Sequence, residues 1–128
     1  MDRLTEYILI KEQLSKGECV SKKCKKVHDM LKTMKKSSVF SKLFTKIGNL
    51  SFACEAKCSM NYYLSKAKQA KADGDPKKAN IYMMKATRWK KETEEYLNRA
   101  NSKINSMRRE NPQAAAAAQK IISYIMKV

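Results

Sequence analysis

The sequence predicts an all-α protein, an antiparallel helical bundle of about four to five helices with two long central helices. Glycine and proline are scarce, with three and two residues in 128, whereas a sheet protein of this length needs more turn residues. Apolar residues make up 43% of the chain, and many recur at spacings of three and four, the period of a helix. The length suits a single core, so we expect one helical domain over residues 1–128.

Residues 1–17 are expected to form a first helix, because Asp2 can cap it and Gly17 ends it. A longer helix then runs from Glu18 to Lys36. Its apolar residues are four, three, four and three positions apart, which places them on one face of a helix that is otherwise rich in lysine. This stripe comprises Val20, Cys24, Val27, Leu31 and Met34.

The segment Ser37–Ser41 breaks this pattern, so we expect a turn there and an antiparallel partner helix that continues towards Ala72. The two arms together form a basic, cysteine-bearing hairpin over residues 18–73. Gly48 lies inside the second arm, where it costs about 1 kcal/mol relative to alanine, and a kink or a close helix approach is expected there. The apolar stripe of this arm comprises Val39, Leu43, Ile47, Leu50, Cys54 and Cys58.

A clear break follows the hairpin. Gly74 suits the end of one helix, Asp75 the cap of the next, and Pro76 its first position. The long helix that begins here covers residues 75–110 and ends before an Asn-Pro dipeptide. An alanine-rich C-terminal helix covers residues 112–128, because its run of five alanines has high helix propensity.

The chain is strongly basic. Lys and Arg number 28 against 12 Asp and Glu, a formal net charge of +16, and a compact body with this charge repels itself unless a polyanion lies near. From Cys19 to Lys71 there are thirteen lysines, no arginine and only two acids. Lysine is a point charge on a flexible stem and lacks the planar fork with which arginine reads guanine. We therefore expect contacts to the phosphate backbone of RNA or DNA, with little sequence specificity.

The predicted nucleic-acid contacts lie on the first arm of the hairpin and just beyond its turn. Those on the first arm lie away from the apolar stripe or flank it, and form a strip of cations about 25 Å long. Such a strip can follow several phosphates. The residues are Lys22, Lys23, Lys25, Lys26, Lys32, Lys35, Lys36, Lys42 and Lys46.

Aromatic residues could add stacking on the bases of a single strand. The candidates are Tyr62, Tyr63, Tyr82 and Trp89. Each of them also fits a helical stripe, so packing in the core is the favoured interpretation of these residues.

Four cysteines occur in two pairs along the chain, Cys19 with Cys24 and Cys54 with Cys58. In an antiparallel hairpin, residues whose numbers share a midpoint face each other. Cys24 with Cys54, and Cys19 with Cys58, both have their midpoint in the predicted turn. All four sulfurs are therefore expected within five residues of helix length, about 7.5 Å.

Three states fit this cluster: free thiols that pack as small apolar residues, a four-thiolate zinc site, and nested disulfides that join Cys19 to Cys58 and Cys24 to Cys54. On a regular α-helix Cys19 and Cys24 diverge by about 140°, which counts against both cross-linked states unless Cys19 lies in a loop after Gly17. The lone histidine, His28, lies too far along the hairpin from Cys58 to share a metal with it, so we expect it at the surface.

We expect no catalytic residues. Three isolated glycines cannot supply a phosphate-binding loop, and one histidine leaves no pair for an acid–base relay. No stretch approaches the ~18 apolar residues of a transmembrane segment, and the N-terminal apolar run is too short for a signal peptide. The cytoplasm or nucleus, with reduced thiols, is the expected location, whereas disulfides need an oxidising compartment or a dedicated oxidase.

The sequence thus predicts a non-enzymatic, lysine-rich nucleic-acid-binding protein, of the kind common among packaging and viral accessory proteins. The alternative is a helical adaptor whose basic face docks an acidic protein partner, with the cysteine cluster as a stabilising clasp or redox switch. A homodimer also stays open, because the apolar stripes suit either a core or a dimer seam.

Overall fold

The computed structural model describes residues 17–36 and 47–128, and within these ranges the regular elements are all helical. This confirms the predicted all-α class. The short π-helix η1 continues directly into α2, and the longest helices are α4, with 23 residues, and α5, with 32. The elements are η1 (Cys19–Cys24), α2 (Lys25–Lys36), α4 (Leu50–Ala72), α5 (Pro76–Met107) and α6 (Pro112–Lys127).

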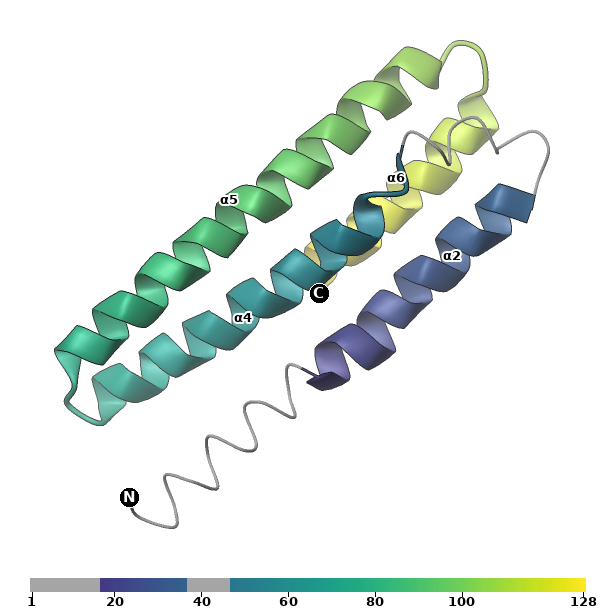
Figure 1. Cartoon of the computed structure of the whole chain (residues 1–128). Helices are drawn as coiled ribbons and strands as arrows, with labels where there is room; N and C mark the ends of the chain where they lie inside the picture. Colours follow the sequence, from purple (N-terminus) through teal and green to yellow (C-terminus); the bar gives the residue numbers. More distant parts are fainter. Residues whose placement is uncertain (1–16, 37–46) are drawn as a thin grey trace.

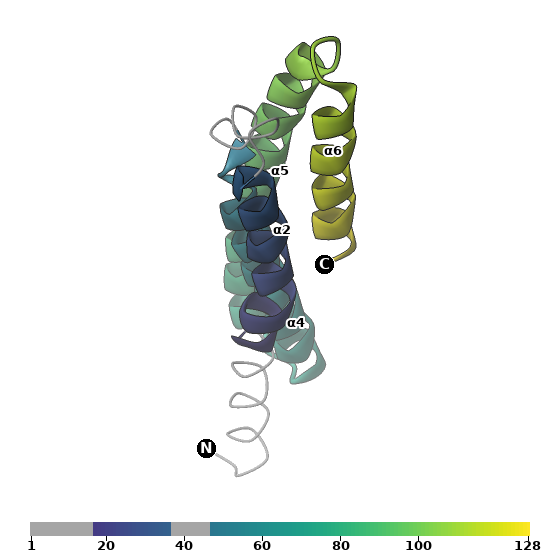
Figure 2. The same ribbon diagram turned by 90° about the vertical axis from the view of Figure 1, so that its right-hand side faces the viewer.

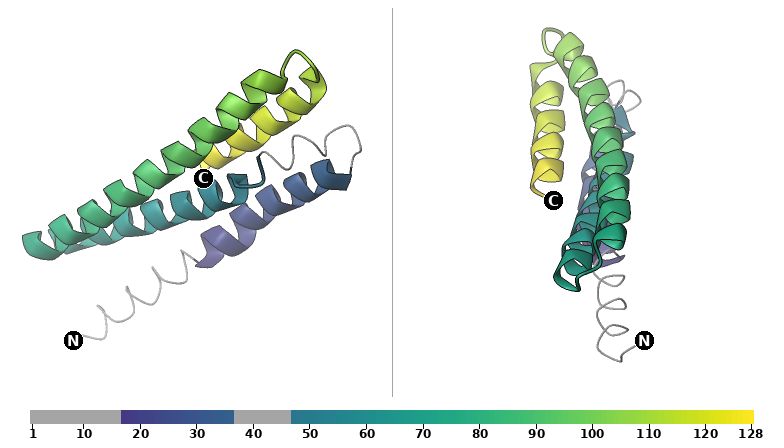
Figure 3. Two further views of the ribbon diagram at one scale, coloured as in Figure 1. Left: turned by 45° about the horizontal axis from the view of Figure 1, so that its top comes forward. Right: turned by 90° about the vertical axis from the view of Figure 1, so that its left-hand side faces the viewer.

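Successive helices run antiparallel to one another (Figure 1). The π-helix η1 lies beside the first half of α4, and α2 lies beside its first turn. The helices α4 and α5 form a long hairpin, and α6 returns along the last part of α5 (Figure 2). Four helices therefore lie together at one end of the bundle. Past the C-terminal end of α6, the helices α4 and α5 continue side by side to their connection (Figure 3). This part of the hairpin carries one of the two candidate surfaces.

Two predicted helix ends differ from the structure. Gly17 does not end a helix, because Gly17 and Glu18 are themselves helical and lead directly into η1. Gly48 and Asn49 form a turn, so α4 begins at Leu50 and the glycine precedes the helix rather than kinking it. The predicted turn at Ser37–Ser41 and most of the predicted first helix lie outside the described residues.

The helix starts at α5 and α6 are built in the same way. Gly74 ends the preceding segment with a φ of 75°, a conformation that glycine adopts without steric cost. The side chain of Asp75 accepts a hydrogen bond from the Lys78 amide at 3.2 Å, and that of Asn111 accepts one from the Ala114 amide at 3.1 Å. Each cap is followed by a proline at the first helical position, where no amide donor is needed.

The hydrophobic core lies in the four-helix part of the bundle. The stripe predicted for the first arm supplies Cys24, Val27, Leu31 and Met34, all of them buried. The alanine run of α6 buries small side chains, and larger ones follow it. The most enclosed large residues of α5 and α6 are Ile104, Ile121, Ile122 and Ile125. In the extended part of the α4–α5 hairpin, the buried residues are small ones such as Ala67, Ala70 and Ala86.

This distribution predicts unequal effects of the same substitution at two sites on α5. Ile104 is fully buried, so Ile104→Ala should lower the free energy of unfolding by about 2–5 kcal/mol. Ile81 is 52% exposed, so Ile81→Ala should change it by no more than about 0.5 kcal/mol. Urea denaturation followed by far-UV circular dichroism measures both, and equal losses would contradict this location of the core.

Candidate functional site

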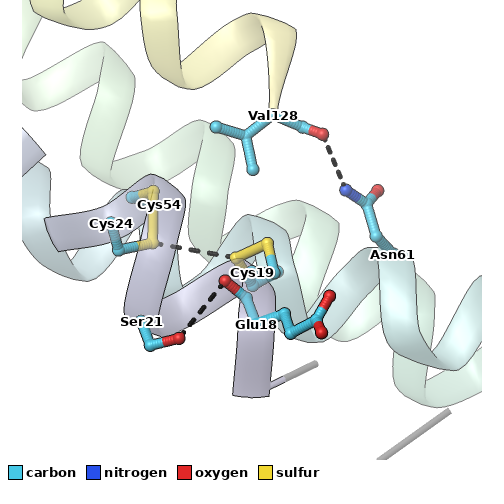
Figure 4. Close-up of a disulfide and its surroundings, with 8 residues drawn as sticks. Glu18, Cys19, Ser21, Cys24, Cys54, Asn61 and Val128 are labelled. Carbon is cyan, nitrogen blue, oxygen red and sulfur yellow. Dashed lines mark hydrogen bonds between the residues drawn. A yellow bond between two sulfur atoms is a disulfide. The ribbon is translucent and has the colours of Figure 1, made fainter. Parts of the chain in front are cut away.

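Two disulfides join η1 to α4 (Figure 4). Cys19 is bonded to Cys58, with Cα atoms 5.8 Å apart, and Cys24 to Cys54, with Cα atoms 5.6 Å apart. Both Cα separations are ordinary for a disulfide, and the pairs are the ones that the shared midpoints predict. Of the states that fit the sequence, the structure therefore shows the nested disulfides. We call these four cysteines the sulfur clasp.

The π-helix explains how Cys19 and Cys24 reach the same partner helix. A π-helix bonds each amide to the carbonyl five residues earlier, so its wider turn brings residues five apart onto one face. Cys54 and Cys58 are four apart and lie on one face of α4 by ordinary α-helical geometry. The cross-linked state therefore needs no loop at Cys19, because the wider helical turn brings both cysteines to α4.

The sulfur clasp is part of the core. Cys24, Cys54 and Cys58 are at most 1% exposed, and Cys19 is half-buried at the edge of the core. The two disulfides also touch each other, because Cys24 Sγ lies 3.7 Å from Cys58 Sγ. Water has little access to three of the four sulfurs.

The C-terminal end of α6 meets α4 beside the clasp. Lys57 Nζ donates a hydrogen bond to the carbonyl oxygen of Met126. Asn61 Nδ2 donates one to the main-chain oxygen of Val128 at 3.0 Å (Figure 4). These donors satisfy oxygens that the helix end leaves without an intrahelical partner, and a cation is favourable at this end of the helix dipole.

The pKa of Lys57 is lowered by burial and by a second positive charge nearby. Burial lowers the pKa of the Lys57 ammonium below its ordinary value of 10.5, and the charge of Lys23 on η1 lowers it further. The two ammonium groups repel each other across the η1–α4 contact. An anion placed near them would reduce this repulsion.

The outer side of η1 and α2 is lined with exposed lysines. Lys25, Lys32 and Lys36 project opposite the buried stripe of α2, because at 100° per residue they fall on the other side of the helix. Glu18 and Asp29 are the acids of the described residues 17–36. We call this surface the basic face. Its members are Lys22, Lys23, Lys25, Lys26, Lys32, Lys35 and Lys36, all exposed.

Lys42 and Lys46, which were also predicted to contact nucleic acid, lie outside the described residues. His28 is exposed on α2, as expected for a histidine that is not part of the cysteine cluster. Lys26 turns towards α6, where its Nζ lies 5.3 Å from the centroid of the Tyr124 ring, a distance at which the cation is attracted to the ring.

A second cluster lies on the extended part of the α4–α5 hairpin. The rings of Tyr62 and Tyr63 have centroids 5.1 Å apart, and Tyr82 of α5 stacks on Tyr63 with centroids 6.3 Å apart. Lys66 Nζ lies 5.1 Å from the Tyr62 centroid and 5.4 Å from that of Tyr82, and Lys85 Nζ lies 5.5 Å from that of Tyr63. We call these five residues the tyrosine–lysine cluster.

The favoured interpretation of these tyrosines as core residues is not what the structure shows. Tyr62, Tyr63 and Tyr82 are half-buried, and none of them belongs to the core cluster of the described residues. The signal in the sequence was the placement of a lysine one helical turn after a tyrosine, as in Tyr62 and Lys66. Trp89 is likewise half-buried.

Comparison with protein-family models, with curated proteins and with solved structures gave no match to this chain. Its function is therefore argued from its own residues. In residues 17–36 and 47–128, no helix combines the length and the apolar character that crossing a bilayer requires.

The nested arrangement predicts a non-additive effect of the two disulfides on stability. Either bond alone closes a loop of 30 or 39 residues in the unfolded chain, worth about 4 kcal/mol. The second bond then closes a much smaller loop and adds less. Replacing one pair by alanine, Cys19 with Cys58 or Cys24 with Cys54, should therefore cost about two fifths of what replacing all four costs, rather than half.

Urea denaturation of the two pair variants and the four-alanine variant measures this, and peptide mapping without reductant identifies the bonds. Strictly additive losses, or a wild-type stability that does not change on reduction, would contradict the nested clasp.

Proposed function

We propose that this protein binds nucleic acid by lysine–phosphate contacts from the basic face, without enzymatic activity and with little sequence specificity. The observation that supports this most is the exposure of seven lysines on η1 and α2, a segment with few acids. Among these lysines, Lys25, Lys32 and Lys36 project opposite the buried stripe. Phosphate contacts of this kind depend on charge and hold the backbone without reading the bases. Such a protein would coat or package nucleic acid rather than recognise a sequence.

The electrostatics around Lys57 support a polyanion as the partner. Lys57 is held close to Lys23 by the sulfur clasp and by its own hydrogen bond to α6. A phosphate near η1 would offset the repulsion between the ammonium groups of Lys57 and Lys23. This repulsion destabilises the unbound protein, so its reduction would contribute to the free energy of binding.

The tyrosine–lysine cluster extends the proposal to single strands. Tyr62 follows Cys58 by one turn of α4, about 6 Å along the axis, and Cys58 is bonded to Cys19 at the start of η1. The cluster and the basic face are therefore attached to one helix by short, rigid connections. Aromatic rings stack on unpaired bases while lysines track the backbone, so a single strand can use both surfaces where a duplex uses the lysines alone.

The disulfides bear on where the protein works. Nested disulfides favour an oxidising compartment or a dedicated oxidase over the reducing cytoplasm or nucleus expected from the sequence. The basic face would also attract an acidic protein, the alternative partner, and binding experiments with nucleic acid separate the two.

Removal of lysine charges should weaken binding in a salt-dependent way. We expect Lys25→Gln, Lys32→Gln and Lys36→Gln together to reduce the slope of log K against log salt by about two, because each lost phosphate contact removes about 0.7–0.9 from it. The matched control replaces three exposed lysines of α5, Lys77, Lys90 and Lys91, by glutamine, and should keep most of the slope.

Fluorescence anisotropy with labelled duplex RNA, duplex DNA and a single strand at several salt concentrations gives these slopes. A flat salt response of the wild type, or equal losses in the two triple variants, would contradict the proposal. Absence of binding at low salt would redirect the search to an acidic protein.

The tyrosines should matter for single strands only. Replacement of Tyr62 and Tyr82 by leucine keeps apolar bulk but removes the rings, and should weaken single-strand binding by about 1–3 kcal/mol for each base that stacks. Duplex binding by the same variant serves as the internal control and should not change. Equal weakening of both ligands, with the helical circular dichroism retained, would rule out base stacking at this cluster.

A further inference from the structure

We propose that, in the reduced protein, the sulfur clasp binds one Zn²⁺ through the thiolates of Cys19, Cys24, Cys54 and Cys58. This inference does not depend on nucleic-acid binding. It starts from the position of the sulfurs in the disulfide-bonded structure, where those of Cys24, Cys54 and Cys58 all lie within 4.8 Å of one another. Thiolate sulfur is the ligand of structural zinc sites, and four of them close the tetrahedron.

The distance between the two disulfides matches the geometry of such a site. With zinc–sulfur bonds of about 2.3 Å, two ligands of a tetrahedron lie about 3.8 Å apart. Cys24 Sγ and Cys58 Sγ belong to different disulfides and are 3.7 Å apart. This edge of the tetrahedron is already formed. Once the disulfides are reduced, the sulfurs of each pair must separate by about 2 Å, and the sulfur of Cys19, which lies outside the group of three, must move towards the other sulfurs. Rotation about the Cα–Cβ bonds supplies movements of this kind.

Two helices each supply two of the four sulfur ligands. Each contributes two thiolates one turn apart, η1 through its wider π-helical turn and α4 through its ordinary one. Three of the sulfurs are buried in the core, which excludes competing water, while the half-buried Cys19 gives the metal access from the surface.

The charges nearby also suit this site. Zinc with four thiolates carries a net charge of −2. Lys57 precedes Cys58 in the chain, and Lys23 precedes Cys24. A negative centre in the clasp is attracted by these two positive side chains.

The disulfide-bonded clasp must be reduced before it can bind zinc. Each disulfide accepts two electrons and two protons from a dithiol reductant, which itself becomes a disulfide, so that each protein disulfide yields two thiols. Zinc then displaces the protons of the four thiols as it binds. The clasp therefore holds η1 to α4 by covalent bonds in an oxidising compartment and by zinc in a reducing one.

Cobalt titration of the whole protein tests this directly. After reduction with a phosphine and removal of oxygen, addition of Co²⁺ should give the visible bands of tetrahedral cobalt and the charge-transfer bands of four thiolates. These should saturate at one equivalent and disappear on addition of Zn²⁺. The oxidised protein should give neither. Cys54→Ser should lose the four-thiolate spectrum, whereas His28→Ala, which removes the single histidine, should keep it.

Circular dichroism of the same samples covers the case in which the reduced, metal-free protein unfolds, because zinc should then restore the helical signal. The proposal would be overturned by a reduced protein that binds no Co²⁺, by an octahedral cobalt spectrum, or by a spectrum that survives Cys54→Ser unchanged. Reduced protein that stays unfolded in the presence of zinc would overturn it as well.

Discussion

The pair of bonds between η1 and α4 is the constraint on which the rest of the arrangement depends. The first arm of the hairpin carries seven lysines in residues 17–36 and buries a narrow stripe of four side chains against the other helices. Its charge opposes that of α4, as the effect of Lys23 on Lys57 shows. Covalent attachment at Cys19 and Cys24 holds the arm in place against this repulsion, and thereby decides which side of η1 and α2 faces the solvent.

The position of the clasp also organises the two candidate surfaces. Towards the start of α4, four helices enclose the core, and the lysines of α2 occupy its outer side. Towards the end of α4, beyond the clasp, half-buried tyrosine rings of α4 and α5 lie together, with lysine ammonium groups above them. One helix therefore links a surface suited to phosphate with a surface suited to unpaired bases. The π-helix makes this possible because it turns both cysteines of the first arm towards α4.

Much of this could be predicted from residue spacing. The four-three pattern from Val20 to Met34 predicted the buried side of α2, and the Asp-Pro pair at 75 and 76 predicted the start of α5, because both signals are local. The cysteine pairing followed from hairpin arithmetic. The π-helix was not predicted, because Cys19 and Cys24, five residues apart, point in different directions on a regular α-helix. The grouping of Tyr63 with Tyr82 depends on how α4 packs against α5, and a stripe on one helix contains no information about its neighbour.

The central claim is that the clasped first arm presents its lysines to a polyanion. Lysine acetylation read by mass spectrometry, with and without a bound single-stranded nucleic acid, tests it most directly because it reports each lysine separately. The account predicts that Lys25, Lys32 and Lys36 lose most of their reactivity in the complex, while Lys77, Lys90 and Lys91 on α5 keep theirs. Protection confined to α5, or equal protection of both sets, would contradict it.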